Sequence, residues 1–142
     1  MDTLIAEAFA RTTASPSAVF AQWADTATWP EWDAGTEWVH LDGEFAEGAR
    51  GVLKPRGGPK VSFVIDRLVP EHQFVDTTSL LGARLTFHHE VSAHEEGGSG
   101  IHVAISMVGP LRRVWARILG TGLRRDLQPS LDQLAHRAAE AP

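Results

Sequence analysis

The sequence feature that most constrains the fold is a long apolar periodicity at the C-terminal end of the chain. Apolar residues recur there at steps of three and four, which predicts one amphipathic helix over residues 111–139. Such a helix is about 40 Å long at a rise of 1.5 Å per residue. Its stripe consists of Leu111, Val114, Trp115, Ile118, Leu119, Leu123, Leu127, Leu131, Leu134 and Ala138. A stripe of this length needs an equally long partner surface.

Three residues inside this helix indicate that it does more than cover a core. Gly120 and Gly122 lie near its middle, where a glycine costs roughly 1 kcal/mol relative to alanine. Pro129 lacks a backbone donor and clashes with the preceding turn, which predicts a kink near residues 125–128. A kinked helix with small residues can leave a space above a curved sheet.

Upstream, the pattern predicts one strand over residues 3–13 and then short helices. Ser15 and Pro16 are a helix N-cap and a first helical residue, and this helix should end near Asp25. Residues 29–33, Trp-Pro-Glu-Trp-Asp, form either a second short helix or an irregular turn. Their two tryptophans are either an aromatic plug or the mouth of a pocket.

From residue 36 the chain predicts short strands separated by glycine and proline. We expect these strands at residues 37–41, 49–54, 61–69, 73–80, 84–93 and 101–108. Hairpin-length connections between them indicate an antiparallel sheet. The length of 142 residues fits one domain, residues 1–142.

Short stretches at residues 14–20, 29–33, 48–51 and 109–111, followed by the Leu127, Leu131, Leu134 tail, carry a resemblance to a known superfamily. With them the chain resembles the START-like or Bet v 1-like superfamily (SRPBCC), especially its bacterial polyketide cyclase/dehydrase-like members. The resemblance implies an α+β helix-grip fold: a seven-stranded antiparallel sheet wrapped around the long C-terminal helix, with two short helices after strand 1 and a cavity inside. It also implies binding of a lipid-, sterol- or polyketide-like ligand, with cyclase or dehydrase chemistry in a minority of members.

The strongest candidate for chemistry comes from the hairpin around Leu81-Gly82. A two-residue turn pairs Leu80 with Ala83 and places alternate residues of both strands on one face. That face is mostly apolar, and on it Asp76 and His89 are diagonal neighbours. They are either an acid/base couple in which the carboxylate orients the imidazole, or a structural pair satisfying itself in the core.

The ligand would be a small apolar molecule, and any reaction would be a proton transfer on a carbonyl compound without a cofactor. Candidate catalytic residues are Asp76 and His89. Candidate ligand-binding residues are Phe63, Ile65, Phe74, Thr78, Leu85, Phe87, Val103, Ile105, Met107, Trp115 and Leu119. The alternative is a co-chaperone-like protein-interaction module whose cavity is filled by side chains. A ligand site should measure some 300 Å³ or more, so cavity volume separates the two.

Composition excludes several other classes of function. The net charge of −5 argues against non-specific nucleic-acid binding, and the arginines of the C-terminal helix are either a solvated face or a local basic patch. Without cysteine, thiolate catalysis and zinc–thiolate sites are excluded, and histidine spacing predicts no metal site. No apolar run is long enough to span a membrane, and no signal peptide is visible, so we expect a cytoplasmic protein. A monomer and a homodimer are both open.

Overall fold

The computed structural model describes residues 2–140, and residues 1, 141 and 142 of the predicted domain lie outside this part. The order of helices and strands confirms the prediction, with boundaries that differ by one or two residues. Residues 26–32 form a 3-10 turn and a short helix, which settles the open choice at Trp29. The elements are β1 (Asp2–Thr12), α1 (Pro16–Ala24), η1 (Thr26–Thr28), α2 (Trp29–Trp32), β2 (Thr36–Asp42), β3 (Arg50–Pro55), β4 (Val61–Val69), β5 (Gln73–Leu80), β6 (Ala83–Ala93), β7 (Ser99–Val108) and α3 (Arg112–Glu140).

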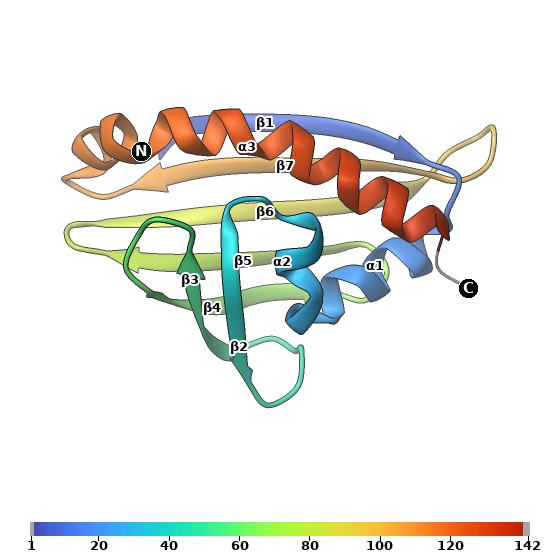
Figure 1. Ribbon diagram of the computed structural model, residues 1–142, viewed down its shortest axis with the longest axis horizontal. Helices are drawn as coiled ribbons and strands as arrows, with labels where there is room; N and C mark the ends of the chain where they lie inside the picture. Colours follow the sequence, from blue (N-terminus) through green and yellow to red (C-terminus); the bar gives the residue numbers. More distant parts are fainter. Residues whose placement is uncertain (1, 141–142) are drawn as a thin grey trace.

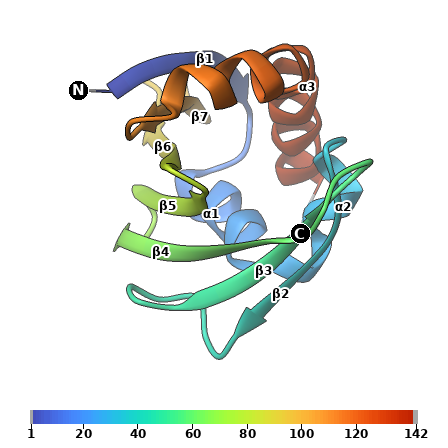
Figure 2. The ribbon, with the colours of Figure 1, turned by 90° about the vertical axis from the view of Figure 1, so that its left-hand side faces the viewer.

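The seven strands form one antiparallel sheet in the order β1-β7-β6-β5-β4-β3-β2. Figure 2 shows that the sheet curves strongly from β1 round to β2, and that α3 lies across its open side. The short helices α1 and α2 close the end of the sheet near the C-terminal half of α3 (Figure 1). This is the helix-grip fold expected from the sequence.

Short-range hydrogen bonds and turn residues determine where α1 and α3 begin. The Ser15 side chain accepts a hydrogen bond from the Ala18 amide (3.2 Å) and Pro16 follows it, so α1 begins where its cap predicts. Before α3, Gly109 has a φ of 113°, and a Cβ there would lie 2.7 Å from the Gly82 carbonyl oxygen. The Leu111 amide donates to that same oxygen (2.9 Å), so the start of α3 is tied to the β5–β6 turn.

The long helix runs without interruption through Pro129, and both views show that it changes direction along its length (Figures 1 and 2). The prediction of one continuous buried stripe is wrong for its first two turns, because Leu111, Val114 and Ile118 are exposed. The later stripe residues Leu131, Leu134 and Ala138 are buried. On the same turns Trp115 and Leu119 are half-buried and pack against the core, so the apolar stripe is wider there than the face that the helix buries.

Two apolar clusters fill the interior. The larger joins the C-terminal half of α3 to α1 and to the middle of the sheet, around Trp23, Phe74 and Leu134. The smaller lies under the first half of α3, around Leu85 and Met107. The candidate site lies between the sheet and α3, where residues of both clusters meet.

Candidate functional site

A cavity of about 440 Å³ lies between the inner face of the sheet and α3. Its wall is mainly apolar and draws on β4 to β7, on α3 and on the tryptophans of α1 and α2. Ten of the thirteen predicted site residues line it. They are Phe63, Asp76, Thr78, Leu85, Phe87, His89, Val103, Ile105, Trp115 and Leu119.

The hairpin register explains why the chemistry-bearing side chains face this cavity. Leu80 pairs with Ala83, Thr78 with Leu85, and Phe74 with His89, as the two-residue turn predicts. Because side chains alternate along a strand, Asp76, Thr78 and His89 then share the inner face. A shift of one residue would have turned all of them outward.

Three predicted cavity residues, Ile65, Phe74 and Met107, are fully buried and do not line the cavity. Phe74 shows the physical reason, because the Trp23 indole of α1 (5.3 Å between ring centroids) and the Phe45 ring (5.1 Å) cover it. Alternation along a strand identifies the face on which a residue lies. It does not tell how much other structure covers that residue.

Other parts of the wall were missed as ligand contacts. The β3–β4 turn, residues 55–59, lines the cavity opposite the middle of α3, and the sequence marked it only as a turn. Trp29 and Trp32 both line the cavity, so the pocket interpretation of this motif describes their position better than a plug. Trp23 also lines it, and its place on the buried side of α1 was the one signal available.

His89 is held in one orientation by the core. Its ring stacks on the Phe74 ring, with 3.8 Å between the ring centroids and an angle of 4° between the planes. The Trp23 indole packs against the imidazole in a T-shaped arrangement, with 5.5 Å between the ring centroids. The Nδ1 atom lies 3.2 Å from the backbone carbonyl oxygen of Phe74. A carbonyl oxygen only accepts, so Nδ1 carries the proton and Nε2 has the free lone pair. Burial lowers the pKa of His89 to about 3, and the imidazole is therefore neutral at pH 7.

Asp76 does not orient this imidazole, contrary to the sequence hypothesis. Its Oδ1 lies 3.7 Å from Nδ1 of His89, too far for a hydrogen bond, and the Phe74 carbonyl already takes that proton. Among residues 2–140 the carboxyl group has no hydrogen-bond partner for Oδ1, which is fully buried. Burial, and secondly the charge of Asp66, raise the pKa of Asp76 to about 8. At pH 7 most Asp76 side chains are therefore neutral acids that can donate a proton.

Two indole N–H groups at the cavity are also buried without a partner in the described part of the chain. These are Nε1 of Trp23 and of Trp32, whereas Trp29 donates to the Trp23 carbonyl (2.9 Å) and Trp115 to the Leu81 carbonyl (2.7 Å). A buried polar group without a partner costs about 1–3 kcal/mol. The cavity wall therefore includes three residues, Trp23, Trp32 and Asp76, that each have a buried polar atom without a partner within residues 2–140.

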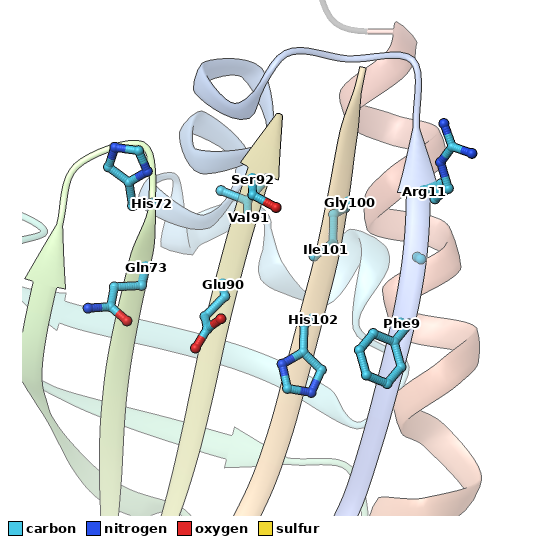
Figure 3. Close-up of a pocket in the computed structure, with 11 residues that line it drawn as sticks. Phe9, Arg11, His72, Gln73, Glu90, Val91, Ser92, Gly100, Ile101 and His102 are labelled. Atoms are coloured by element: carbon cyan, nitrogen blue, oxygen red, sulfur yellow. The ribbon is translucent and has the colours of Figure 1, made fainter. Parts of the chain in front are cut away.

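A larger but open hollow of about 690 Å³ lies on the other face of the sheet (Figure 3). Its residues come from β1, β6, β7 and the start of β5, and several of its polar groups are already engaged. His102 stacks under Phe9 (4.4 Å between ring centroids) and its Nε2 contacts Glu7 Oε2 at 2.7 Å. Arg11 contacts His94 Nδ1 at 3.0 Å. We regard the inner cavity as the candidate site, because Asp76 and His89 are buried in its wall, and within residues 2–140 Asp76 Oδ1 and His89 Nε2 have no hydrogen-bond partner.

Within residues 2–140, no three side chains of histidine, aspartate or glutamate gather closely enough to hold a metal ion. None of the helices in this range is long and apolar enough to cross a membrane.

Solved structures with little sequence in common have the same fold. Ara h 8.0201 superposes with a TM-score of 0.71 at 14% identity, over 99% of this chain and 100% of its own. Norcoclaurine synthase from Thalictrum flavum, in complex with dopamine and hydroxybenzaldehyde, gives 0.73 at 14%, over 100% and 89%. The di-domain ARO/CYC StfQ from the steffimycin biosynthetic pathway gives 0.74 at 13%, over 98% of this chain and 50% of its own. No family model matches the sequence, and no curated protein is similar to it. At these identities the matches show a Bet v 1-like fold alone.

Proposed function

We propose that the protein binds a small apolar ligand, of lipid-, sterol- or polyketide-like character, in the cavity between the sheet and α3. The observation that carries the proposal is the cavity itself. Its volume of about 440 Å³ is within the range of small-molecule sites, roughly 300–1,000 Å³, and its wall is mainly apolar. The interaction-module alternative requires a cavity filled by side chains, and this volume argues against it.

The structural neighbours support the proposal in a general way. The norcoclaurine synthase structure contains two small aromatic molecules, dopamine and hydroxybenzaldehyde, and StfQ is an ARO/CYC protein of a biosynthetic pathway. The norcoclaurine synthase complex shows that a protein with this fold can bind compact ring compounds. Fold likeness alone does not transfer their ligands or reactions to this chain.

A pair of neighbouring positions on α3 gives a matched test. Leu119 is half-buried and lines the cavity, whereas Ile118 is exposed. We expect an environment-sensitive dye such as anilinonaphthalene sulfonate to bind the folded protein saturably at one site. Leu119→Trp should fill part of the cavity and lower the affinity for the dye at least about tenfold, which is a loss of roughly 1.4 kcal/mol of binding free energy. Ile118→Trp adds the same indole outside and should leave the affinity unchanged.

Fluorescence titration of the three proteins, with circular dichroism to check the fold, measures this difference. Absence of saturable binding by the folded wild type would refute the proposal. Equal loss in both variants would place the dye on the surface of α3 instead of in the cavity.

A further inference from the structure

We propose that the ligand is an apolar ketone, whose carbonyl oxygen accepts a hydrogen bond from Asp76 and whose α-carbon faces Nε2 of His89, and that the site interconverts its keto and enol forms. This inference rests on the ligand-binding function proposed above and specifies its substrate class. It also changes the roles assigned from the sequence. Asp76 acts on the ligand directly, and the Phe74 backbone is the group that orients His89.

The two ring nitrogens of His89 have different surroundings. Nδ1 is occupied by the Phe74 carbonyl at 3.2 Å, and the stack on the Phe74 ring fixes the plane of the imidazole. Only Nε2 remains free, and among the described residues it has no hydrogen-bond partner. Because His89 is neutral at pH 7, Nε2 has a lone pair that can accept a proton.

Asp76 can offer a ligand a hydrogen-bond donor. An ionised carboxylate would repel a carbonyl oxygen, whereas a neutral carboxylic acid donates to it. The surroundings keep this acid neutral, because the group is buried among apolar side chains and its Oδ1 has no partner within residues 2–140. The raised pKa of about 8 agrees with that environment. A hydrogen-bond donor beside a free base matches a neutral molecule with an acceptor next to an acidic C–H group, and a ketone has both.

The proposed step balances with these two groups alone. Nε2 of His89 takes a proton from the α-carbon, and the electron pair of that C–H bond becomes the C=C bond of the enol. The π pair of the carbonyl moves to its oxygen, which takes the Asp76 proton. The products are a neutral enol, an imidazolium and a carboxylate. In the reverse step the imidazolium returns a proton to the α-carbon, on the same or the opposite face of the double bond, and the carboxylate takes back the proton from the enol oxygen.

The distance between the two side chains favours this transfer. In the resting state neither group is charged, so their 3.7 Å separation contributes little. During the transfer the same separation brings an imidazolium next to a carboxylate, and their attraction offsets part of the desolvation cost that burial imposes on each charge. The attraction arises only as the reaction proceeds, which is the condition for an interaction to increase the rate.

Binding of two ring compounds of the same shape tests the recognition of the carbonyl. We expect 2-tetralone to bind about tenfold more tightly than tetralin, which lacks the carbonyl, as one net hydrogen bond predicts. Asp76→Leu should abolish the preference, whereas Asp76→Asn, which retains an N–H donor, should keep most of it. Equal affinities for the two compounds in the wild type would overturn the ketone assignment and leave apolar binding intact. Failure of both compounds to bind would instead contradict the proposed function.

Exchange of the C1 protons of 2-tetralone for deuterium, followed by NMR in D2O, tests the proton transfer. We expect the wild-type protein to accelerate exchange about a hundredfold or more over buffer, the lower range for general acid–base catalysis. His89→Phe and His89→Gln should both return the rate to that of buffer, with retained tetralin binding as proof of folding. His88→Phe is the matched control, because His88 points to the opposite face of the same strand and should retain full activity. Unchanged exchange in a folded His89 variant, or no acceleration by the wild type, would overturn the inference.

Discussion

The two halves of α3 have the same apolar periodicity but different surroundings. In the C-terminal half, Leu134 is completely buried and Leu131 is 3% exposed, in a solid cluster with Trp23 and Phe74. In the N-terminal half, Ile118 is 62% exposed, and Leu119 faces the cavity. Both halves thus contribute to the cavity wall, but Leu131 and Leu134 of the C-terminal half are buried in the larger core cluster, whereas Leu119 of the N-terminal half is only half-buried. An amphipathic pattern records which side of a helix faces inward, but it does not record what lies opposite.

The same contrast is visible in the sheet beneath the helix. Towards α1, aromatic rings fill the interior, with Trp23, Phe74 and His89 in mutual contact. Trp23 and His89 also line the cavity, which extends from them towards Leu119. Asp76 and His89 lie where these two environments meet. The solid end can hold them rigidly while the open end gives a ligand access to them, and this arrangement suits a site that needs oriented polar groups in apolar surroundings.

The largest effect expected from this comparison is on stability in the solid half. Leu134→Ala should lower the free energy of unfolding by about 2–5 kcal/mol, because it removes fully buried methyl groups and leaves a void among close-packed neighbours. Leu119→Ala, which removes the same atoms from a side chain that is only half-buried, should cost clearly less. Urea denaturation of both variants measures the difference. If the two losses were equal, the halves of α3 would not differ in packing, and the contrast drawn here would be wrong.

An effect of intermediate size is expected in the pH dependence of stability, and it comes from Asp76 and His89. Asp76 has its pKa raised from 3.8 to about 8, so the folded state holds an extra proton and stability falls as pH rises through this range. His89 has its pKa lowered from 6.5 to about 3, so its contribution to stability is lost as pH falls from 6.5 towards 3. Between about pH 4 and 6.5 the changes of stability with pH that come from Asp76 and from His89 have opposite signs and cancel. From pH 6.5 to 8 only the Asp76 slope remains, which predicts a loss of roughly 2 kcal/mol.

Chemical denaturation of the wild type and of Asp76→Asn across this pH range isolates the effect. The difference between the two profiles should grow from pH 6.5 to 8, since asparagine does not titrate there. Other titrating groups are common to both proteins and drop out of the difference. Parallel profiles would mean that Asp76 is ionised in the folded protein, and the donor role proposed for it would then be untenable.

Much of the fold was predictable because it depends on short-range patterns. The Leu81-Gly82 turn defined the register of β5 and β6, and that register was sufficient to place Asp76 and His89 on one inner face. The cap at Ser15 located α1 in the same way. These features depend on residues that are neighbours in sequence or directly opposite in a hairpin.

The depth and polarity of the site could not be predicted, because they depend on contacts between distant segments. Phe74 and Met107 have the same alternation as the cavity residues, yet other elements cover them. The hydrogen bond from His89 to the Phe74 carbonyl involves a backbone atom, which no side-chain pattern reveals. Within residues 2–140 the Trp23 indole N–H has no hydrogen-bond partner, and this too depends on how α1 packs against the sheet.

The smallest effect is expected at the exposed end of the comparison. Ile118→Ser should change the free energy of unfolding by no more than about 0.5 kcal/mol, because the side chain is 62% exposed and contributes little buried area. The matched change Leu119→Ser, one position along, should cost more, since it places a hydroxyl in the wall of the cavity. Denaturation at several protein concentrations also tests for a homodimer on this face, where Leu111, Val114 and Ile118 are all exposed. A dimer that buried them would make the loss in Ile118→Ser large and dependent on concentration. In that case the first half of α3 would be an interface, and its exposed residues would have the same packing role in the dimer as Leu134 has within the chain.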